Sequence, residues 1–335
     1  MRIKRYVFLS ILLMVALGFF VYSQIDKVYT FEIFGVPVTL PVAIWIVIPM
    51  IIMFLASFFH MAYYSFINFM VLKRYKKDYE TLISSFANAI LREPKKHQYK
   101  TIEAKNLGRI SDKSHIIPQD FKIDISDERL KKPLEYLKDI TNGIYVEIEG
   151  FSLSPKNPIL VQNYENRLKN EPTFSGVILK KCSEYPNELC QKALEVYMSF
   201  SDMSKIKEYA KVFTFATLLK LIEHYKAQEE LMHYQDILYI LQESQMKMSE
   251  REYLTLAKAC KAVLAPDERL KLFEHLKDKD ERSEGAYVYT LLDLEMIEKA
   301  KEYLETTHED ELLNYKAYLE LKDCGKNYPL EMFAQ

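Results

Sequence analysis

The sequence YVFLSILLMVALGFFVY occupies residues 6–22, and a second apolar stretch, VTLPVAIWIVIPMIIMFLASFFHMAYY, follows at residues 38–64. A helix of about 20 apolar residues crosses the ~30 Å hydrocarbon core of a bilayer. The two stretches therefore predict a transmembrane hairpin, with spans at about 6–23 and 40–64 in an N-terminal part of residues 1–77. A cleavable signal peptide is the alternative for the first stretch. However, the small-residue cleavage pattern is poor around residues 21–23, and a second apolar stretch follows.

Basic residues flank this hairpin at both of its ends and are scarce in the loop between the spans. The loop holds only Lys27, beside Asp26. Positively charged flanks remain on the cytoplasmic side of a membrane. We therefore expect a protein of the bacterial inner membrane with both termini in the cytoplasm, and Trp45 as an interfacial aromatic anchor. The residues that set this orientation are Arg2, Lys4, Arg5, Lys73, Arg74, Lys76 and Lys77.

His60 is the one ionisable residue well inside an apolar stretch. Such residues are functional candidates by default. His60 precedes Lys73 by about three turns of helix, however, so contact with water near the cytoplasmic surface is the simpler interpretation. The loop at residues 28–40 alternates in polarity and predicts a small extended excursion rather than a domain.

Charge and cysteine content restrict what the rest of the chain can do. Residues 1–77 carry eight basic and two acidic side chains, so the formal net charge of −2 for the whole chain leaves −8 for residues 78–335. An acidic domain argues against a nucleic-acid partner. Cys182, Cys190, Cys260 and Cys324 form no C-x-x-C pair. We expect buried free thiols on helices, because the alternative, a disulfide, requires an oxidising compartment.

Residues 78–155 predict a juxtamembrane helix followed by a small mixed α/β connector, with a loop-rich connector as the alternative. Apolar residues at helical spacing, from Tyr79 to Ile90, extend the second span as an amphipathic stalk to about Arg92. This stripe predicts packing against the domain behind it, with a dimer seam or lipid contact as the alternatives. Residues 99–104, 121–125 and 144–149 alternate like short strands, and a capped helix is expected from Ser126 to about Ile140.

Residues 156–335 predict a succession of helices with short breaks, which makes the chain mainly α. Short breaks force antiparallel neighbours, so the expected unit is a helix hairpin. Tyr253, Tyr287 and Tyr315 begin similar hairpins about thirty residues apart, a period typical of an α-solenoid. An irregular bundle is the alternative. The expected helices are 157–170, 187–200, 203–226, 228–243, 249–264, 267–278, 284–293, 295–306 and 309–322.

Two resemblances extend this interpretation. Residues 286–306 look like a tetratricopeptide repeat, with Ala300 and Leu304 at the small and large positions of its second helix. Residues 1–92 resemble the two-span domain of the lipopolysaccharide-assembly protein A family, including Leu40-Pro41 at the start of the second span. The resemblance implies a function in envelope assembly. A haem-biosynthesis-associated membrane protein family has a similar layout of two spans followed by repeats.

Motifs for common chemistry are missing from the sequence. The chain has eight glycines and none of the phosphate-binding arrangements, no G-x-S-x-G and no H-E-x-x-H. Glu230-x-x-His233 would place two metal ligands on one helical face, but a di-iron site needs a second such pair. His224 and His275 are expected to be ordinary helix residues. We therefore predict no enzyme activity, no cofactor and no metal.

Binding is the function that remains. Tyrosine is enriched at protein interfaces, and the candidate partner-binding residues are Tyr234, Tyr239, Tyr287 and Tyr303. The sequence predicts a membrane-anchored scaffold that binds an unidentified protein in envelope assembly or in a flagellar or secretion complex. A homo-oligomer would form through the hairpin or the stalk. The alternative is an accessory or enzymatic membrane protein of haem or lipid metabolism, with a site in the cytoplasmic domain.

Overall fold

The computed structural model describes residues 3–33, 35–308 and 310–334, and the chain is mainly helical, as predicted. Two compact units make up the chain, residues 1–131 and residues 132–335. Arg2, one of the residues expected to set the orientation, lies outside the described residues.

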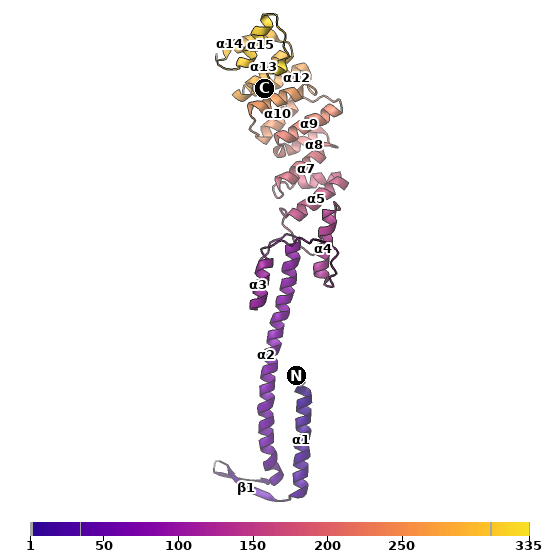
Figure 1. Ribbon diagram of the computed structural model, residues 1–335, viewed down its shortest axis with the longest axis vertical. Helices are drawn as coiled ribbons and strands as arrows, with labels where there is room; N and C mark the ends of the chain where they lie inside the picture. Colours follow the sequence, from indigo (N-terminus) through magenta and orange to yellow (C-terminus); the bar gives the residue numbers. More distant parts are fainter. Residues whose placement is uncertain (1–2, 34, 309, 335) are drawn as a thin grey trace. The chain divides into compact units, whose positions relative to one another are not determined.

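The first unit begins with a helix hairpin. Helix α1 (Ile3–Gln24) runs beside the first half of α2 (Val42–Ile90) (Figure 1). The Tyr6 and Phe54 rings stack 6.0 Å apart, and a Cβ placed on Gly18 would lie 3.2 Å from Val47. Strands β1 (Val28–Ile33) and β2 (Val36–Pro41) pair antiparallel between the two helices, as expected for an extended excursion. Both helices are long and apolar enough to span a membrane.

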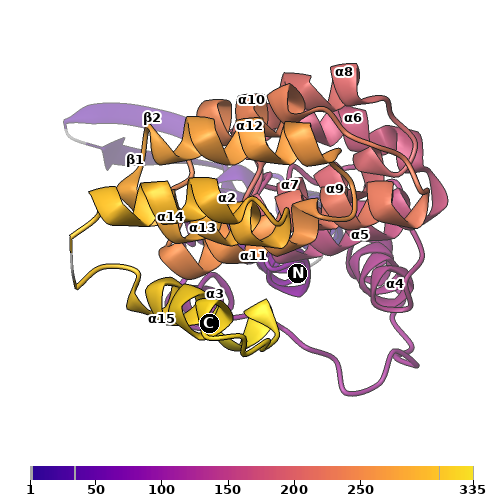
Figure 2. The same ribbon diagram turned by 90° about the horizontal axis from the view of Figure 1, so that it is seen from above.

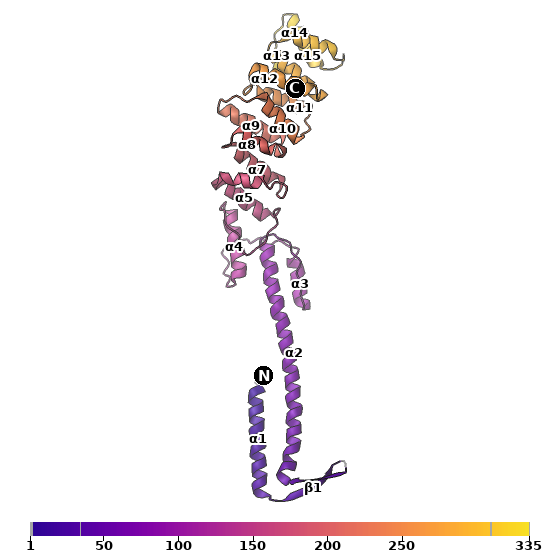
Figure 3. The same ribbon diagram turned by 180° about the vertical axis from the view of Figure 1, so that it is seen from behind.

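Helix α2 continues for 49 residues, through Pro49, and ends close to the predicted end of the stalk. The predicted stripe does not form one buried face. Ile83 and Ile90 are buried, whereas Tyr79 is 57% exposed. Helix α3 (Ile102–Ser111) packs beside the stalk part of α2 (Figure 3).

The strands expected in the connector are wrong, whereas its expected helix, from Ser126 to about Ile140, is present as α4 (Glu128–Thr141). Every residue from 78 to 155 is described, and none lies in a strand; the segment holds the end of α2, α3 and α4. Residues 102–104 are helical because Asp78, on α2, accepts hydrogen bonds from the N–H groups of Lys100 and Thr101 at 2.6–3.0 Å. A side chain from elsewhere thus supplies the cap that starts α3.

Residues 144–149 alternate in sequence but pair with a side chain rather than a strand. The Val146 N–H donates to the Asn163 side-chain oxygen at 3.0 Å, and the Asn163 amide donates to the Val146 carbonyl at 2.7 Å. Both backbone groups are satisfied without a neighbouring strand. No ladder is therefore needed at this position.

The second unit is a succession of short helices, several of which match the predicted boundaries closely. They are α5 (Pro158–Asn170), α6 (Ser175–Leu179), α7 (Asn187–Met198), α8 (Met203–Ile206), α9 (Phe215–Ala227), α10 (Tyr234–Ser244), α11 (Glu250–Cys260), α12 (Pro266–Lys277), α13 (Glu284–Asp293), α14 (Ile297–Thr306) and α15 (Leu313–Asp323), with 3₁₀ turns at Pro172–Phe174, Lys207–Val212, Glu281–Ser283 and Leu330–Met332.

Three expected helices begin or divide elsewhere. The stretch 203–226 is split because Thr214 and Thr217 form a capping box that starts α9. The stretch 228–243 starts late, since Glu229 has a φ of 57° and α10 begins only at Tyr234. The last expected helix included Glu309, which is outside the described residues, and α15 begins at Leu313.

These helices pack in two layers. Helices α5, α7, α9, α11 and α13 contact one another in sequence, and α10 and α12 pack together beside them (Figure 2). Buried side chains such as Leu218, Ile240 and Phe273 form one continuous core through the layers. Each helix therefore buries its apolar face by stacking on its neighbours.

The expectation of buried free thiols on helices is correct for only one of the four cysteines, Cys260. Cys182, in the turn after α6, is joined by a disulfide to Cys190 on α7. The packing of α6 on α7 brings these two residues together, which the sequence spacing alone did not reveal. Cys260 is a buried free thiol on a helix, and Cys324 is free and exposed.

Candidate partner-binding site

Two of the four predicted tyrosines form one cluster. The rings of Tyr287 on α13 and Tyr303 on α14 lie 5.1 Å apart, edge to face, and the Lys277 ammonium lies 5.0 and 5.1 Å from their centres. Burial, followed by the nearby Glu284 carboxylate, raises the pKa of Tyr303. Tyr287 is buried, so it fills the space between helices and presents little surface to a partner.

The other two tyrosines lie on α10 with different neighbours. The Tyr234 ring is 5.8 Å from His275 on α12, and the Lys207 ammonium is 5.9 Å from the centre of the Tyr239 ring. Tyr239 is 44% exposed, which makes it the most accessible of the four predicted residues.

A groove in the second unit lies between α11, α13 and the start of α15. It encloses about 1100 Å³. None of the four predicted tyrosines is among its described lining residues; the tyrosine there is Tyr315. The lining residues are Ser249, Glu250, Arg251, Leu254, Thr255, Lys258, Arg282, Gly285, Leu312, Asn314, Tyr315 and Ala334.

The charged side chains of this groove are mainly basic. Arg251, Lys258 and Arg282 outnumber Glu250. The Arg282 guanidinium is held by Asp280, with N···O distances of 3.0 and 2.8 Å. Hydrogen bonds from Arg282 hold the pKa of Asp280 below its usual range despite burial, so Asp280 stays ionised and fixes Arg282 at the groove.

The last described residues of the chain lie against the same groove. The Lys258 ammonium donates to the Ala334 carbonyl at 2.8 Å, and the Asn314 amide donates to the Phe333 carbonyl at 2.5 Å. Sequence reasoning missed Lys258 and Asn314 as binding residues. The contact from Lys258 spans 76 positions, and one lysine among many gives no signal of it.

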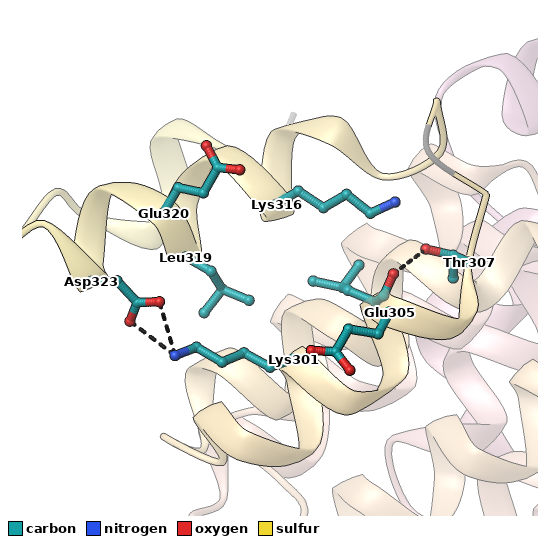
Figure 4. A pocket seen from close by; sticks show the side chains of 8 residues that line it. Lys301, Glu305, Thr307, Lys316, Leu319, Glu320 and Asp323 are labelled. Atoms are coloured by element: carbon teal, nitrogen blue, oxygen red, sulfur yellow. Dashed lines mark hydrogen bonds and ion pairs between the residues drawn. The ribbon is translucent and has the colours of Figure 1, made fainter.

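A smaller pocket of about 390 Å³ lies between α14 and α15 (Figure 4). Lys301 is paired with Asp323 across its mouth at 2.9 Å, and Lys316 donates to the His308 carbonyl at 2.7 Å. Its remaining charges are the carboxylates of Glu305 and Glu320. Both lysines of this pocket therefore have partners among the described residues.

The candidate metal motif does not form on a helix. Glu230 and His233 both precede α10, so they do not share the helical face that the motif needs. His233 lies 3.9 Å from Glu268 instead. The described residues contain no group of three or more His, Cys, Asp or Glu side chains arranged to hold a metal ion.

One polar cluster that the sequence did not predict lies in the first unit. The Asp112 carboxylate accepts hydrogen bonds from Ser85 at 2.8 Å and Tyr99 at 3.2 Å, and contacts the His97 ring nitrogen at 2.7 Å. Burial alone would raise the pKa of Asp112, but hydrogen bonds led by His97 hold it below its usual range. The cluster ties residues 97–112 to the stalk, and a Cβ on Gly108 would collide with the Tyr99 ring.

The residues expected at the membrane lie along the α1–α2 hairpin. Trp45 donates from its indole N–H to the Tyr29 carbonyl at 3.1 Å, at the end that carries the β hairpin. His60 is exposed on the protein surface, beside Tyr64 and in a shallow pocket that includes Tyr6. Lys4 and Arg5 therefore lie within about one turn of the level of His60, because α1 is helical there.

No family profile matches this chain, and neither a curated protein nor a solved structure is significantly similar to it.

Proposed function

We propose that this chain is an adaptor of the bacterial inner membrane, anchored by α1 and α2, whose helical unit captures a protein partner. The process is cell-envelope assembly or the building of a large membrane complex, such as flagellar or secretion machinery. One observation carries the proposal: side chains of α11 and α15 bind main-chain carbonyls in a preformed groove. Such contacts hold peptide backbone and need no reacting group.

The arrangement of the helices supports a repeat architecture for this unit. Helices α7, α9, α11 and α13 stack in one layer, and α10 and α12 stack in the next. We propose that these are tetratricopeptide-like hairpins of an α-solenoid. In such a fold, each helix pair contacts its neighbours and leaves an extended face for binding.

The pairing of α1 with α2 supports one position for the bilayer. From Val42 to His60, α2 rises by about 28 Å, which matches a hydrocarbon core of about 30 Å. Lys4 and Arg5 lie near the level of His60, so we propose that they mark the cytoplasmic surface. Lys73 then stands about 20 Å further along α2, so the second basic cluster, Lys73 to Lys77, does not lie at the same surface.

This position leaves an apolar part of α2 outside the hydrocarbon. Phe66, Phe69 and Leu72 are 62%, 61% and 67% exposed. A helix that is apolar on all sides is stable only when it is covered. We propose that the predicted homo-oligomer forms through this segment, residues 65–72, which would cover it with the same segment of a second copy.

The disulfide and the basic flanks favour different compartments. A disulfide is typical of oxidising compartments, whereas the basic flanks favour a cytoplasmic helical unit. The basic flanks favour the cytoplasm, and the disulfide is not needed for the fold, because the packing of α6 on α7 holds Cys182 and Cys190 together with or without a bond between them. In the cytoplasm we therefore expect this pair to be reduced.

Two experiments test the proposal. Reporter fusions at Asp26 and at the C-terminus should show the loop outside and the C-terminus inside, and an external C-terminus would refute the cytoplasmic location. Co-purification from membranes should recover a partner with the full chain and lose it when residues 156–335 are removed. Recovery of the same proteins without that region would refute the adaptor function.

A further inference from the structure

We propose that the groove of α11, α13 and α15 binds a carboxylate-bearing peptide segment of the partner, and that residues 328–334, whose Ala334 lines the groove, cover one edge of it until the partner displaces them. This inference rests on the proposed adaptor function. It adds the binding surface, the chemistry of the ligand and an intramolecular competitor.

The C-terminal residues are held as a peptide ligand would be held. Lys258 and Asn314 donate to the carbonyls of Ala334 and Phe333, at 2.8 and 2.5 Å. These hydrogen bonds are made to main-chain carbonyls, so a segment of different sequence could accept from the same donors. Without a bound segment, Lys258 and Asn314 would have to donate to water instead.

Two buried side chains and one ring contact anchor this segment. Leu330 and Ala334 are buried in the continuous core of the unit, and the Phe333 ring packs 5.3 Å from the Tyr318 ring on α15. Met332, in contrast, is 60% exposed, and Glu331 is exposed. A segment that displaces residues 328–334 must therefore fill the two buried positions with apolar side chains of its own.

The open part of the groove has the charge to recognise a carboxylate. Arg251 and Lys258 are exposed basic side chains two turns apart on α11, and Arg282, which is paired with Asp280, lines the same space. Glu250 is the acidic residue in the lining, which leaves the groove positive. A carboxylate next to the bound backbone would form charge-assisted hydrogen bonds there.

The probe is the chain's own segment supplied as a separate peptide. Fluorescein-labelled, C-terminally amidated Tyr-Pro-Leu-Glu-Met-Phe-Ala, matching residues 328–334, is titrated by anisotropy with the full chain and with a chain that ends at Asn327, both in detergent micelles. A tethered competitor acts at millimolar effective concentration, so we expect the shortened chain to bind about tenfold more tightly or better. Leu330→Ser in the full chain keeps the length of the segment and removes one buried anchor, so it should also increase the affinity for the labelled peptide.

Matched variants test the contacts within the shortened chain. Lys258→Ala should abolish the gain in peptide affinity that shortening the chain produces. Lys271→Ala should leave this gain unchanged, because Lys271 lies on α12 and is paired with Asp267 of its own helix. A peptide with lysine in place of the glutamate should bind at least several-fold more weakly.

Equal binding by the full and shortened chains, with circular dichroism showing both folded and Leu330→Ser also without effect, would overturn the inference. So would insensitivity to Lys258→Ala. If co-purification still requires residues 156–335 in that case, the adaptor function stands and only the groove is wrong.

Discussion

Asp293 joins two successive helix hairpins through a buried ion-pair network, and its removal should destabilise the second unit strongly. Its carboxylate lies 2.9 Å from the Arg269 guanidinium on α12 and 2.6 Å from the Lys261 ammonium at the end of α11. Arg269 is 4% exposed, and two of its nitrogens, Nε and Nη2, are buried without a hydrogen-bond partner among the described residues. Asp293 is thus its one ion-pair partner in that part of the chain.

Asp293→Ala would leave the guanidinium buried and unpaired, which costs about 3–5 kcal/mol. For a unit of this size that corresponds to a fall in Tm of about 6–20 °C. The assay is thermal unfolding of the full chain in detergent, followed by circular dichroism at 222 nm. Asp267→Ala is the control, because its side chain is 69% exposed in its pair with Lys271, and such pairs contribute at most about 1 kcal/mol.

The double variant Arg269→Met with Asp293→Leu distinguishes the cost of losing the ion pair from the cost of leaving one buried charge unpaired. Replacing both partners by apolar groups should cost less than Asp293→Ala alone, because no buried charge remains unpaired. Burial alone would raise the pKa of Asp293, but hydrogen bonds from Lys261 and Arg269 hold it below 3.8. The stabilisation is therefore present above that pH and is lost as the pH falls through the lowered pKa. A fall in Tm for Asp293→Ala as small as that for Asp267→Ala would show that the buried ion pair does not stabilise the unit in this way.

Three further changes have defined outcomes. Asp78→Ala should release α3 from the stalk, which hydrogen exchange would detect as a loss of amide protection over residues 100–111. Burial would raise the pKa of Asp78, but hydrogen bonds led by Thr101 keep this pKa below 3.8. Acid should therefore release α3 only below that pH. Phe69→Glu should shift the chain towards monomer in cross-linking from membranes, and an unchanged pattern would contradict association through residues 65–72. Acid quenching of cells, followed by alkylation in denaturant because Cys190 is buried, should modify Cys182 and Cys190 as free thiols; protection of both would show that the disulfide persists and would favour an oxidising compartment.

The parts of the fold that could be predicted are those set by local periodicity. The apolar stretches and the stalk predicted each end of α2 to within two residues, because helical spacing continues from the span into the charged region. The connector failed for a different reason. Asp78 caps α3 from 22 positions away, and Asn163 takes the place of a strand partner for Val146 from 17 positions away. No local pattern encodes such distant partners.

The candidate site was out of reach for the same reason. The enrichment of tyrosine at protein interfaces suggested a binding surface, yet Tyr287 is buried, and the groove is defined by Lys258, Asn314 and the last described residues of the chain. Lysine and asparagine occur throughout a charged helical chain, so their type carries no information. They come to one place because the start of α15 lies beside Gly285 of α13 and the 3₁₀ turn Leu330–Met332 packs against α13.

Membrane anchoring and an occupied groove have a joint consequence. A tethered segment competes at millimolar effective concentration, so a dilute peptide in solution would displace it poorly. A partner confined to the same membrane is itself concentrated near the groove, and it can compete where a soluble peptide of equal intrinsic affinity cannot. The proposed occupation by residues 328–334 would thus make capture selective for membrane-bound partners. Shortening the chain should then increase binding of a soluble peptide more than binding of the same peptide fixed to the bilayer by a lipid anchor.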